Sequence, residues 1–189
     1  MKKRALYSNL IDFKPRIIVT SIVIITIFLI NVAIYFKYTL SHSAEVSFFF
    51  NKAFLKGHAL VVDGDSIIIS SIMIRLLGID APELHQSCGT SKKRYPCGLK
   101  AKKHLEKLIA RKPVTCYWNK KDKYHRILAT CKTEQINNIN ATMVRDGWAI
   151  SYYDYRKEER KAKKQKKGIW QSSFQKPQEW RKAHSHINQ

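Results

Sequence analysis

The chain has 189 residues, which fits one ordinary domain with extensions. Its 35 Lys and Arg residues outnumber 14 Asp and Glu residues, giving a formal net charge of +21, and the first 45 residues hold only six of the basic residues and two of the acidic ones. The charge is therefore not confined to an N-terminal tail, and a basic main body favours a polyanionic partner, either nucleic acid or an anionic membrane surface, with a merely solvated basic face as the alternative.

The N-terminal segment combines a basic stretch with a long apolar run. Residues 17–36 contain no charged side chain, and a helix of about twenty residues matches the roughly 30 Å core of a bilayer. Because five Lys or Arg precede the run and only Lys37 follows closely, the positive-inside rule places residues 1–16 in the cytoplasm and the main body in the periplasm or outside the cell. We expect an uncleaved single-pass anchor; the alternative is a signal peptide cut near Ser41 or Ser43.

The next segment leads from this expected transmembrane helix into a region of strands. Residues 37–56 are typical of a juxtamembrane linker, and within it the apolar stretch 46–54 either begins the fold or lies on the membrane. From Gly57 onward, short runs of β-branched residues alternate with turn residues, as in "HALVV", "DGD", "SIIIS" and "IMIRLLGI". This pattern predicts a meander of antiparallel strands.

An arginine stands in one of these apolar strands. If residues 70–71 form the turn before it, Arg75 lies opposite Ser66 and beside Asp65. A charge that faces a core must be paired, because burying a lone charge is costly. Two interpretations are open: a structural ion pair with Asp65 or Asp80, or a guanidinium that holds a phosphate oxygen with its bidentate fork.

The four cysteines fit an oxidising compartment. Two of them lie in one polar stretch, and the other two lie in apolar runs on either side of "KKDKYHR". If these runs form a hairpin with its turn between Lys123 and Tyr124, one cysteine faces the other on an apolar face. We therefore predict two disulfides, Cys88–Cys97 and Cys116–Cys131. The alternatives are four reduced thiols or a zinc site, and the absence of a CxxC motif disfavours zinc.

Three further segments carry helical patterns, and they are residues 98–110, 138–149 and 156–170. Five short strands combined with about three helices predict an α+β fold, namely a small five-stranded β-barrel of the oligonucleotide/oligosaccharide-binding (OB) type. The expected boundaries of this domain are 57–174, followed by a C-terminal tail at 175–189.

Acidic residues on either side of the strand arginine suggest a metal site and a general base. Asp65 and Asp80 supply the hard oxygen ligands that Ca²⁺ prefers, and the carbonyl of Ala81 can join them. Glu83, three residues after Asp80, is placed to act as a general base on a water molecule. None of these motifs is specific alone, since "DGD" is most often only a turn.

Two arginines complete the set. Arg75 and Arg126, the latter at the expected hairpin tip, supply guanidinium groups that match the charge of a phosphate. A metal that positions the phosphate, a base that deprotonates water and arginines that stabilise the transition state are together the requirements for hydrolysing a phosphodiester.

The chain resembles the thermonuclease (staphylococcal nuclease-like) family from about Gly57 to Trp170. The resemblance rests on "VVDGDS", "IRLLGIDAPE", "KDKYHR", "INATMVRDGWA" and "EERKAKKQKKGIW", which occur in the family's order with compatible gaps. It implies a five-stranded barrel and Ca²⁺-dependent cleavage of DNA and RNA, with products that carry 3′-phosphates.

Carried over position by position, the resemblance assigns roles to nine residues. The implied catalytic residues are Arg75, Glu83 and Arg126, the implied Ca²⁺ ligands are Asp65, Asp80 and Ala81, and the implied nucleotide contacts are Lys123, Tyr124 and Tyr152. The chain departs from the family at Ala81, where the type member has threonine, and at Asp154, which aligns with a second tyrosine of the nucleotide pocket. The loop after Glu83 carries an extra cysteine pair.

Two other functions compete with an outward-facing, monomeric, membrane-anchored nuclease that prefers single strands. One is a catalytically inactive OB-type module that binds nucleic acid while tethered to the membrane. The other is a basic protein of the membrane surface without a catalytic role. The presence of every charged catalytic group argues against an inactive domain.

Overall fold

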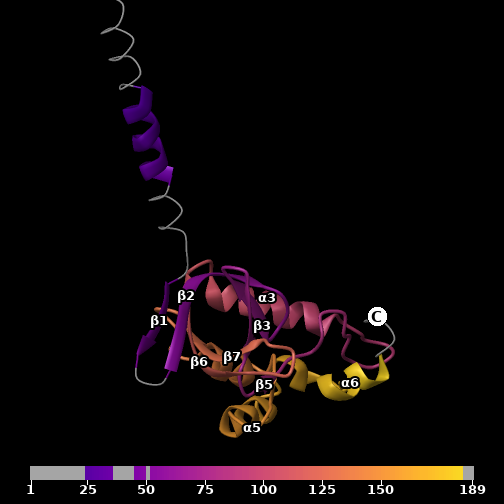
Figure 1. Ribbon diagram of the computed structural model, residues 1–189. Coiled ribbons are helices and arrows are strands. Elements are labelled where there is room, and N and C mark those ends of the chain that lie inside the picture. Colours follow the sequence, from indigo (N-terminus) through magenta and orange to yellow (C-terminus); the bar gives the residue numbers. More distant parts are fainter. Residues whose placement is uncertain (1–23, 36–44, 50–51, 185–189) are drawn as a thin grey trace, which may run out of the picture. The chain divides into compact units, whose positions relative to one another are not determined.

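The computed structural model describes residues 24–35, 45–49 and 52–184 of the chain (Figure 1). The chain divides into two units, Met1–Ser43 and Ala44–Gln189. All strands in the described residues and all the expected site residues belong to the second unit.

The described part of the first unit is a helix. Residues 24–35, which fall within the expected membrane anchor, are helical. No helix in the described ranges has both the length and the apolar character needed to cross a membrane. Residues 1–23 and 36, as well as the alternative cleavage region at 41–43, lie outside the described residues.

Five strands of the second unit close into a barrel. In spatial order they are β2 (Lys52–Val61), β3 (Ser66–Ile69), β4 (Ile72–Leu76), β7 (Ile127–Lys132) and β6 (Pro113–Lys121). Strand β6 pairs back onto β2, which closes the barrel, and every pairing is antiparallel except that of β4 with β7. This confirms the predicted α+β class and the five-stranded barrel.

The sheet begins before the expected domain boundary at Gly57. Strand β1 (Glu45–Phe49) pairs with β2, and residues 53–58 of β2 pair with β6. Ala53 and Leu55 are both buried, as period-two alternation requires of a strand with one face on the core. Of the two alternatives for residues 46–54, the backbone pairing agrees with the one in which this stretch begins the fold.

The β3–β4 hairpin has the predicted register. Its two central residues, Ser70 and Ser71, have φ values of 47° and 65°, and two positive φ angles are typical of the tight turns that match strand twist. Arg75 consequently faces Ser66 across the ladder. Because side chains alternate along a strand, the neighbouring Ile74 is fully buried in the core.

The β6–β7 hairpin has the predicted pairing near its base and departs from it toward the tip. Cys116 faces Cys131, and both predicted disulfides, Cys116–Cys131 and Cys88–Cys97, are present. Beyond Trp118 the register shifts by one residue. A bulge of this kind re-aims the strand that carries it, and here it precedes the tip that carries Arg126.

Five helical segments accompany the barrel, two more than expected. They are α3 (Cys97–Ile109), α4 (Ile139–Arg145), α5 (Arg156–Lys164), the 3₁₀ helix η1 (Gly168–Gln171) and α6 (Pro177–Ala183). Figure 1 shows α3 and α5 on opposite sides of the barrel. Helix α6 lies in the expected C-terminal tail, where Pro177 occupies its first turn after an extended Lys176, a preferred way to start a helix.

Candidate active site

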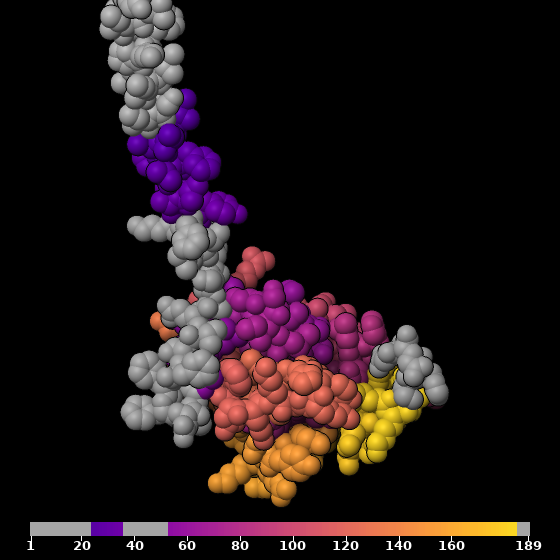
Figure 2. Space-filling view, viewed as in Figure 1, coloured from indigo at the N-terminus to yellow at the C-terminus, as the bar shows by residue number. Residues whose placement is uncertain are grey.

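A cleft of about 960 Å³ opens beside the barrel. It is lined by the end of β4 and the segment that follows, the tip of the β6–β7 hairpin, the segment after β8 (Ile150–Ser151), and α6. In the space-filling view, α6 (yellow) lies at the surface next to the part of the chain that contains this hairpin (salmon; Figure 2). Seven residues assigned from the sequence line the cleft: Arg75, Asp80, Glu83, Lys123, Tyr124, Arg126 and Tyr152.

Asp65 lies directly behind Arg75. Nη1 of Arg75 donates to Oδ1 of Asp65 at 2.6 Å, and Nη2 donates to Oδ1 of Asp80 at 2.8 Å. The two aspartates are only 3% and 2% exposed. The structure therefore contains the structural ion pair that was one of the two interpretations of Arg75. Arg75 pairs with Asp65 and with Asp80 at the same time.

Close packing brings the turn with Asp65 against the strand with Asp80. A Cβ on Gly64 would lie 2.7 Å from Cβ of Ala81, so only glycine allows this approach without displacement. The amide of Ala81 donates to Oδ2 of Asp65 at 2.9 Å. On the other side, Asp80 belongs to β5 (Ile79–Asp80), which pairs with β8.

Burial makes the ionised form of Asp65 costly. Desolvation is the largest influence on Asp65, and together with the charges of Asp63 and Asp80 it outweighs the opposing effects of Arg75 and the Ala81 amide, so that the pKa of Asp65 is raised to about 7. Burial also opposes the charge on Arg75, but attraction to Asp65 and Asp80 outweighs it and raises the pKa of Arg75. Near neutral pH, an additional positive charge would therefore stabilise the ionised form of Asp65 beside Asp80.

The donor groups fit an oxygen-ligated cation such as Ca²⁺. Within the described residues, Oδ2 of Asp65 accepts a hydrogen bond only from Ala81, and Oδ2 of Asp80 only from Arg181. Since an ionised carboxylate has about four acceptor positions, each aspartate can take a further ligand. The described part of the chain has no group of three or more His, Cys, Asp or Glu side chains placed to hold a metal. Further ligands would therefore be a backbone carbonyl, water or substrate oxygens.

Glu83 lies in a tightly hydrogen-bonded loop. Its amide donates to the side-chain oxygen of Gln86 at 3.1 Å, and its carbonyl accepts from the Gln86 amide at 2.8 Å. A Cβ on Gly98 would lie 1.7 Å from the Glu83 carbonyl oxygen, so α3 can begin against this loop only with glycine there. The half-buried carboxylate accepts through Oε1 from Arg181, and none of the described residues donates to Oε2.

The tip of the β6–β7 hairpin carries a cluster of cations around Tyr124. Nε of Arg126 donates to Oδ2 of Asp122 at 2.7 Å, and its guanidinium carbon lies 5.5 Å from the Tyr124 ring centroid. Burial is the largest single influence and opposes ionisation of Asp122, but the hydrogen bonds from Arg126 and Tyr124 together outweigh it and lower the pKa of Asp122. Nζ of Lys123 lies 4.9 Å from the same ring. The Nη groups of Arg126 have no acceptor among the described residues, so they are available to an anion.

A second aromatic surface follows β8. The amide of Tyr152 donates to the carbonyl of Gly78 at 2.9 Å, and the Tyr152 and Tyr153 rings meet edge to face with centroids 4.4 Å apart. Both side chains are exposed. Asp154 also lines the cleft and packs against Gly78. Tyr153 thus adds an aromatic ring that the sequence comparison did not assign, next to the departure at Asp154.

Arg181 of α6 is the other site residue that sequence reasoning missed. Its Nη1 donates to Oδ1 of Asp80 at 3.0 Å and to Oε1 of Glu83 at 2.5 Å, and its Nη2 donates to Oδ2 of Asp80 at 3.2 Å. Burial opposes its charge, yet hydrogen bonds to these carboxylates raise the pKa of Arg181. A single arginine in "EWRK" carries no spacing signal that would connect it to residues about a hundred positions earlier.

Comparison with known proteins places this chain in a family. The model of the family described as "Staphylococcal nuclease homologue" matches residues 73–172, which is more than half of the chain. An uncharacterized endonuclease of Escherichia coli is 33% identical over 120 residues, covering 58% of this chain and 72% of that protein. A micrococcal nuclease of Shigella flexneri is 32% identical over 147 residues, covering 65% and 78%.

A relative from a eukaryote is matched over a smaller share of its own length. A probable endonuclease of Verticillium alfalfae is 32% identical over 129 residues, covering 59% of this chain and 44% of that protein. The family match includes Arg75, Glu83 and Arg126 and ends before Arg181. The barrel and the extent of this match together show that the chain belongs to the staphylococcal nuclease homologue family.

Proposed function

We propose that the chain is a Ca²⁺-dependent nuclease that hydrolyses phosphodiesters of DNA and RNA and leaves 3′-phosphate ends. Family membership and relatives named as nucleases make it a hydrolase of ester bonds in nucleic acid. The observation that carries the finer proposal is the arrangement around one cleft of two buried aspartates, a glutamate with a free oxygen, and arginines from separate elements.

The metal ligands in this proposal are Asp65, Asp80 and the backbone carbonyl of Ala81. A bound Ca²⁺ would neutralise the two buried carboxylates and bind an oxygen of the substrate phosphate. The free acceptor positions of the two aspartates support this assignment, because Oδ2 of Asp65 and Oδ2 of Asp80 each accept only one hydrogen bond from the described residues.

Glu83 acts as the general base. Oε1 is held by Arg181, whereas Oε2 is free to accept a proton from a water molecule that attacks phosphorus. Arg75 and Arg126 donate hydrogen bonds to the phosphate oxygens as negative charge increases in the transition state. The free Nη groups of Arg126 support this role, whereas Arg75 keeps its ion pairs with the aspartates while it binds.

The walls of the cleft suit an unpaired strand, and we propose that the nuclease domain binds it as a monomer. Tyr124 is 65% exposed and Tyr152 is 45% exposed, and exposed rings of this kind stack on bases that are not already stacked in a duplex. Lys123, beside Tyr124, adds a cation for the backbone. These features support a preference for single strands of either DNA or RNA.

Cleavage by the full chain tests the proposal. We expect single-stranded DNA to be cut in millimolar Ca²⁺ and to remain intact when a chelator is added, because the aspartates alone do not bind the phosphate. The fragments should accept a radiolabel at the 3′ end only after phosphatase treatment. Fragments with free 3′-hydroxyls would refute the product assignment. Undiminished cleavage in chelator would refute the role of Ca²⁺.

The same assay addresses the competing function. Binding of DNA with a micromolar or lower Kd, without cleavage in Ca²⁺ or other divalent cations, would leave an inactive nucleic-acid-binding barrel. The complete set of charged groups around the cleft favours the enzyme.

We also propose that residues 17–36 anchor the chain in a membrane, with residues 1–16 in the cytoplasm and the nuclease domain in the periplasm or outside the cell. The support is the uncharged run and the basic residues that precede it. We expect the full chain to stay in the membrane fraction after carbonate washing, and a variant lacking residues 1–43 to become soluble. Recovery of the full chain in the soluble fraction would contradict the anchor.

A further inference from the structure

We propose that Arg181 is a third phosphate-binding arginine of this site, supplied by the segment that follows the family match. The inference rests on the proposed nuclease function and adds a residue that contacts the substrate. It starts from the observation that a guanidinium from α6 binds both the candidate general base and a candidate metal ligand.

The hydrogen bonds of Arg181 leave one edge of its guanidinium free. A guanidinium has five N–H donors in a planar fork. Nη1 uses both of its donors, on Asp80 and Glu83, and Nη2 uses one on Asp80. Nε and the second donor of Nη2 have no acceptor among the described residues. These two donors form the edge that binds a phosphate in a bidentate manner.

The position of Arg181 makes this edge reachable by substrate. The residue lines the same cleft as Arg75 and Arg126, and its side chain is 36% exposed. A phosphate held on the free edge would be fixed relative to Glu83, because one rigid planar group would contact both. Arg181 thus differs from a mobile surface cation, which would attract the strand without orienting it.

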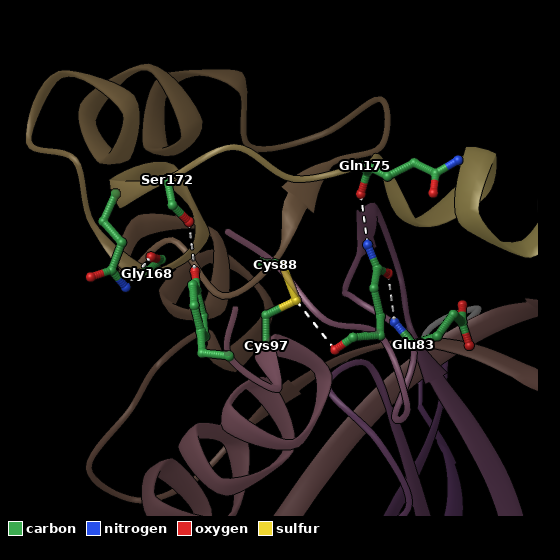
Figure 3. Close-up of a disulfide and its surroundings, with 9 residues drawn as sticks. Glu83, Cys88, Cys97, Gly168, Ser172 and Gln175 are labelled. Atoms are coloured by element: carbon green, nitrogen blue, oxygen red, sulfur yellow. Dashed lines mark hydrogen bonds between the residues drawn. A yellow bond between two sulfur atoms is a disulfide. The ribbon is translucent and has the colours of Figure 1, made fainter. Parts of the chain in front are cut away.

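The segment that carries Arg181 is tied to the loop that carries Glu83. We call residues 172–184 the C-terminal strap. The buried side chain of Gln86, whose oxygen accepts from the Glu83 amide, donates through Nε2 to the carbonyl of Gln175 at 2.7 Å (Figure 3). The amide of Gly89 donates to the carbonyl of Ser173 at 2.8 Å. One buried glutamine therefore connects the candidate base to the strap.

The extra disulfide lies where it supports this connection. Cys88 and Cys97 cross-link the loop after Glu83, and they pack with Ile169 and the partly buried Trp170 and Phe174. Figure 3 shows the disulfide between the two places where the strap meets the loop, at Ser172 and at Gln175. The loop after Glu83, the Cys88–Cys97 disulfide and the C-terminal strap thus form one structure that supports Arg181.

Two other roles for Arg181 are distinguishable from phosphate binding. A purely structural ion pair would affect stability without changing the affinity for DNA. A clamp that competes with Ca²⁺ for Asp80 would inhibit the enzyme, so its removal would increase cleavage at low Ca²⁺. Phosphate binding alone predicts that removal weakens both DNA binding and cleavage.

The test compares full-length wild type with Arg181→Gln, Arg181→Lys and Lys176→Gln. Lys176→Gln removes the same charge from the same strap, at an exposed residue whose only described ion pair, with Glu179, is 3.9 Å long. The Kd for a single-stranded oligonucleotide is measured in chelator at several salt concentrations, so that no cleavage occurs. Initial rates of cleavage in Ca²⁺ then give kcat and KM.

We expect Arg181→Gln to reduce the salt slope of log K by about 0.7, the value for one phosphate contact on a single strand, while Lys176→Gln leaves it near the wild-type value. In Ca²⁺, kcat/KM should fall about 10- to 100-fold, with part of the loss in kcat because the phosphate is misplaced. Arg181→Lys should restore the salt slope but not kcat, since an ammonium lacks the planar fork.

Three results would overturn the inference. They are a salt slope for Arg181→Gln equal to that of Lys176→Gln, a full restoration of kcat by Arg181→Lys, and faster cleavage by Arg181→Gln at low Ca²⁺. In each case wild type still cleaves DNA, so the nuclease proposal stands. If wild type fails to cleave, the nuclease proposal fails instead, and the salt slope still reports whether Arg181 contacts phosphate.

Discussion

A Glu83→Gln variant is expected to cleave single-stranded DNA about 10²- to 10⁴-fold more slowly than wild type at saturating Ca²⁺. The glutamine amide has nearly the same size and can still accept a hydrogen bond from Arg181 through its oxygen. It cannot take a proton from water. The loss should therefore appear in kcat, while the melting temperature changes little.

Binding separates the role of a base from a loss of structure. In chelator, Glu83→Gln should bind the oligonucleotide at least as tightly as wild type, because one negative charge has been removed from the cleft. Glu106→Gln, at an exposed position on α3, is the control with the same chemical change. Cleavage by Glu83→Gln within tenfold of wild type would assign the base to another group.

An Arg75→Ala variant is expected to lose about 3–5 kcal/mol of its free energy of unfolding at pH 8 in chelator. Arg75 pairs with two aspartates that are almost completely buried, and removing one partner of such a network leaves charge without compensation. Asp80 retains Arg181, so Asp65 bears most of the cost. The measurement is urea unfolding followed by tryptophan fluorescence.

The pH dependence of this loss has a definite sign. Desolvation, opposed in the wild type by Arg75, already raises the pKa of Asp65 to about 7. Without Arg75 the carboxyl binds its proton more tightly still, so the variant's additional loss of stability develops above about pH 7, where Asp65 of the wild type ionises and Asp65 of the variant keeps its proton. Ca²⁺ should restore part of the loss by supplying positive charge. Arg160→Ala, at an exposed position on α5, is the control; a loss below about 1 kcal/mol for Arg75→Ala at pH 8 would refute the argument.

The sequence predicts those parts of the barrel in which two signals agree, namely the alternation of apolar side chains along a strand and the residues that form the turn. The register that places Arg75 opposite Ser66 follows from a two-residue turn, and that of Cys116 with Cys131 follows from an apolar face. Seven of the nine residues assigned from the family resemblance line one cleft, to which the end of β4, the tip of the β6–β7 hairpin and the segment after β8 all contribute. Their chemical roles stay predictions.

The parts that were not predictable depend on contacts between distant segments. The register shift after Trp118 involves an exposed strand end, where one extra residue leaves no mark in the apolar pattern. Helix α6 has only seven residues and lacks enough apolar positions to show a period. Arg181 reaches Glu83 across 98 positions of the chain, through a strap whose path is set by Gln86 and a disulfide.

The pairing of strands that are far apart in the chain also determines when the cleft comes into existence during folding. Ala53 pairs with Trp118 and His58 with Pro113, which are 65 and 55 positions apart. The entropy of closing such long loops must be overcome before the contacts form, so this step is slow compared with the microsecond formation of single hairpins. Arg75 and Arg126 lie on different hairpins, and the pairing of β4 with β7 joins these hairpins, so a chain with both hairpins formed but not yet paired with each other has no cleft.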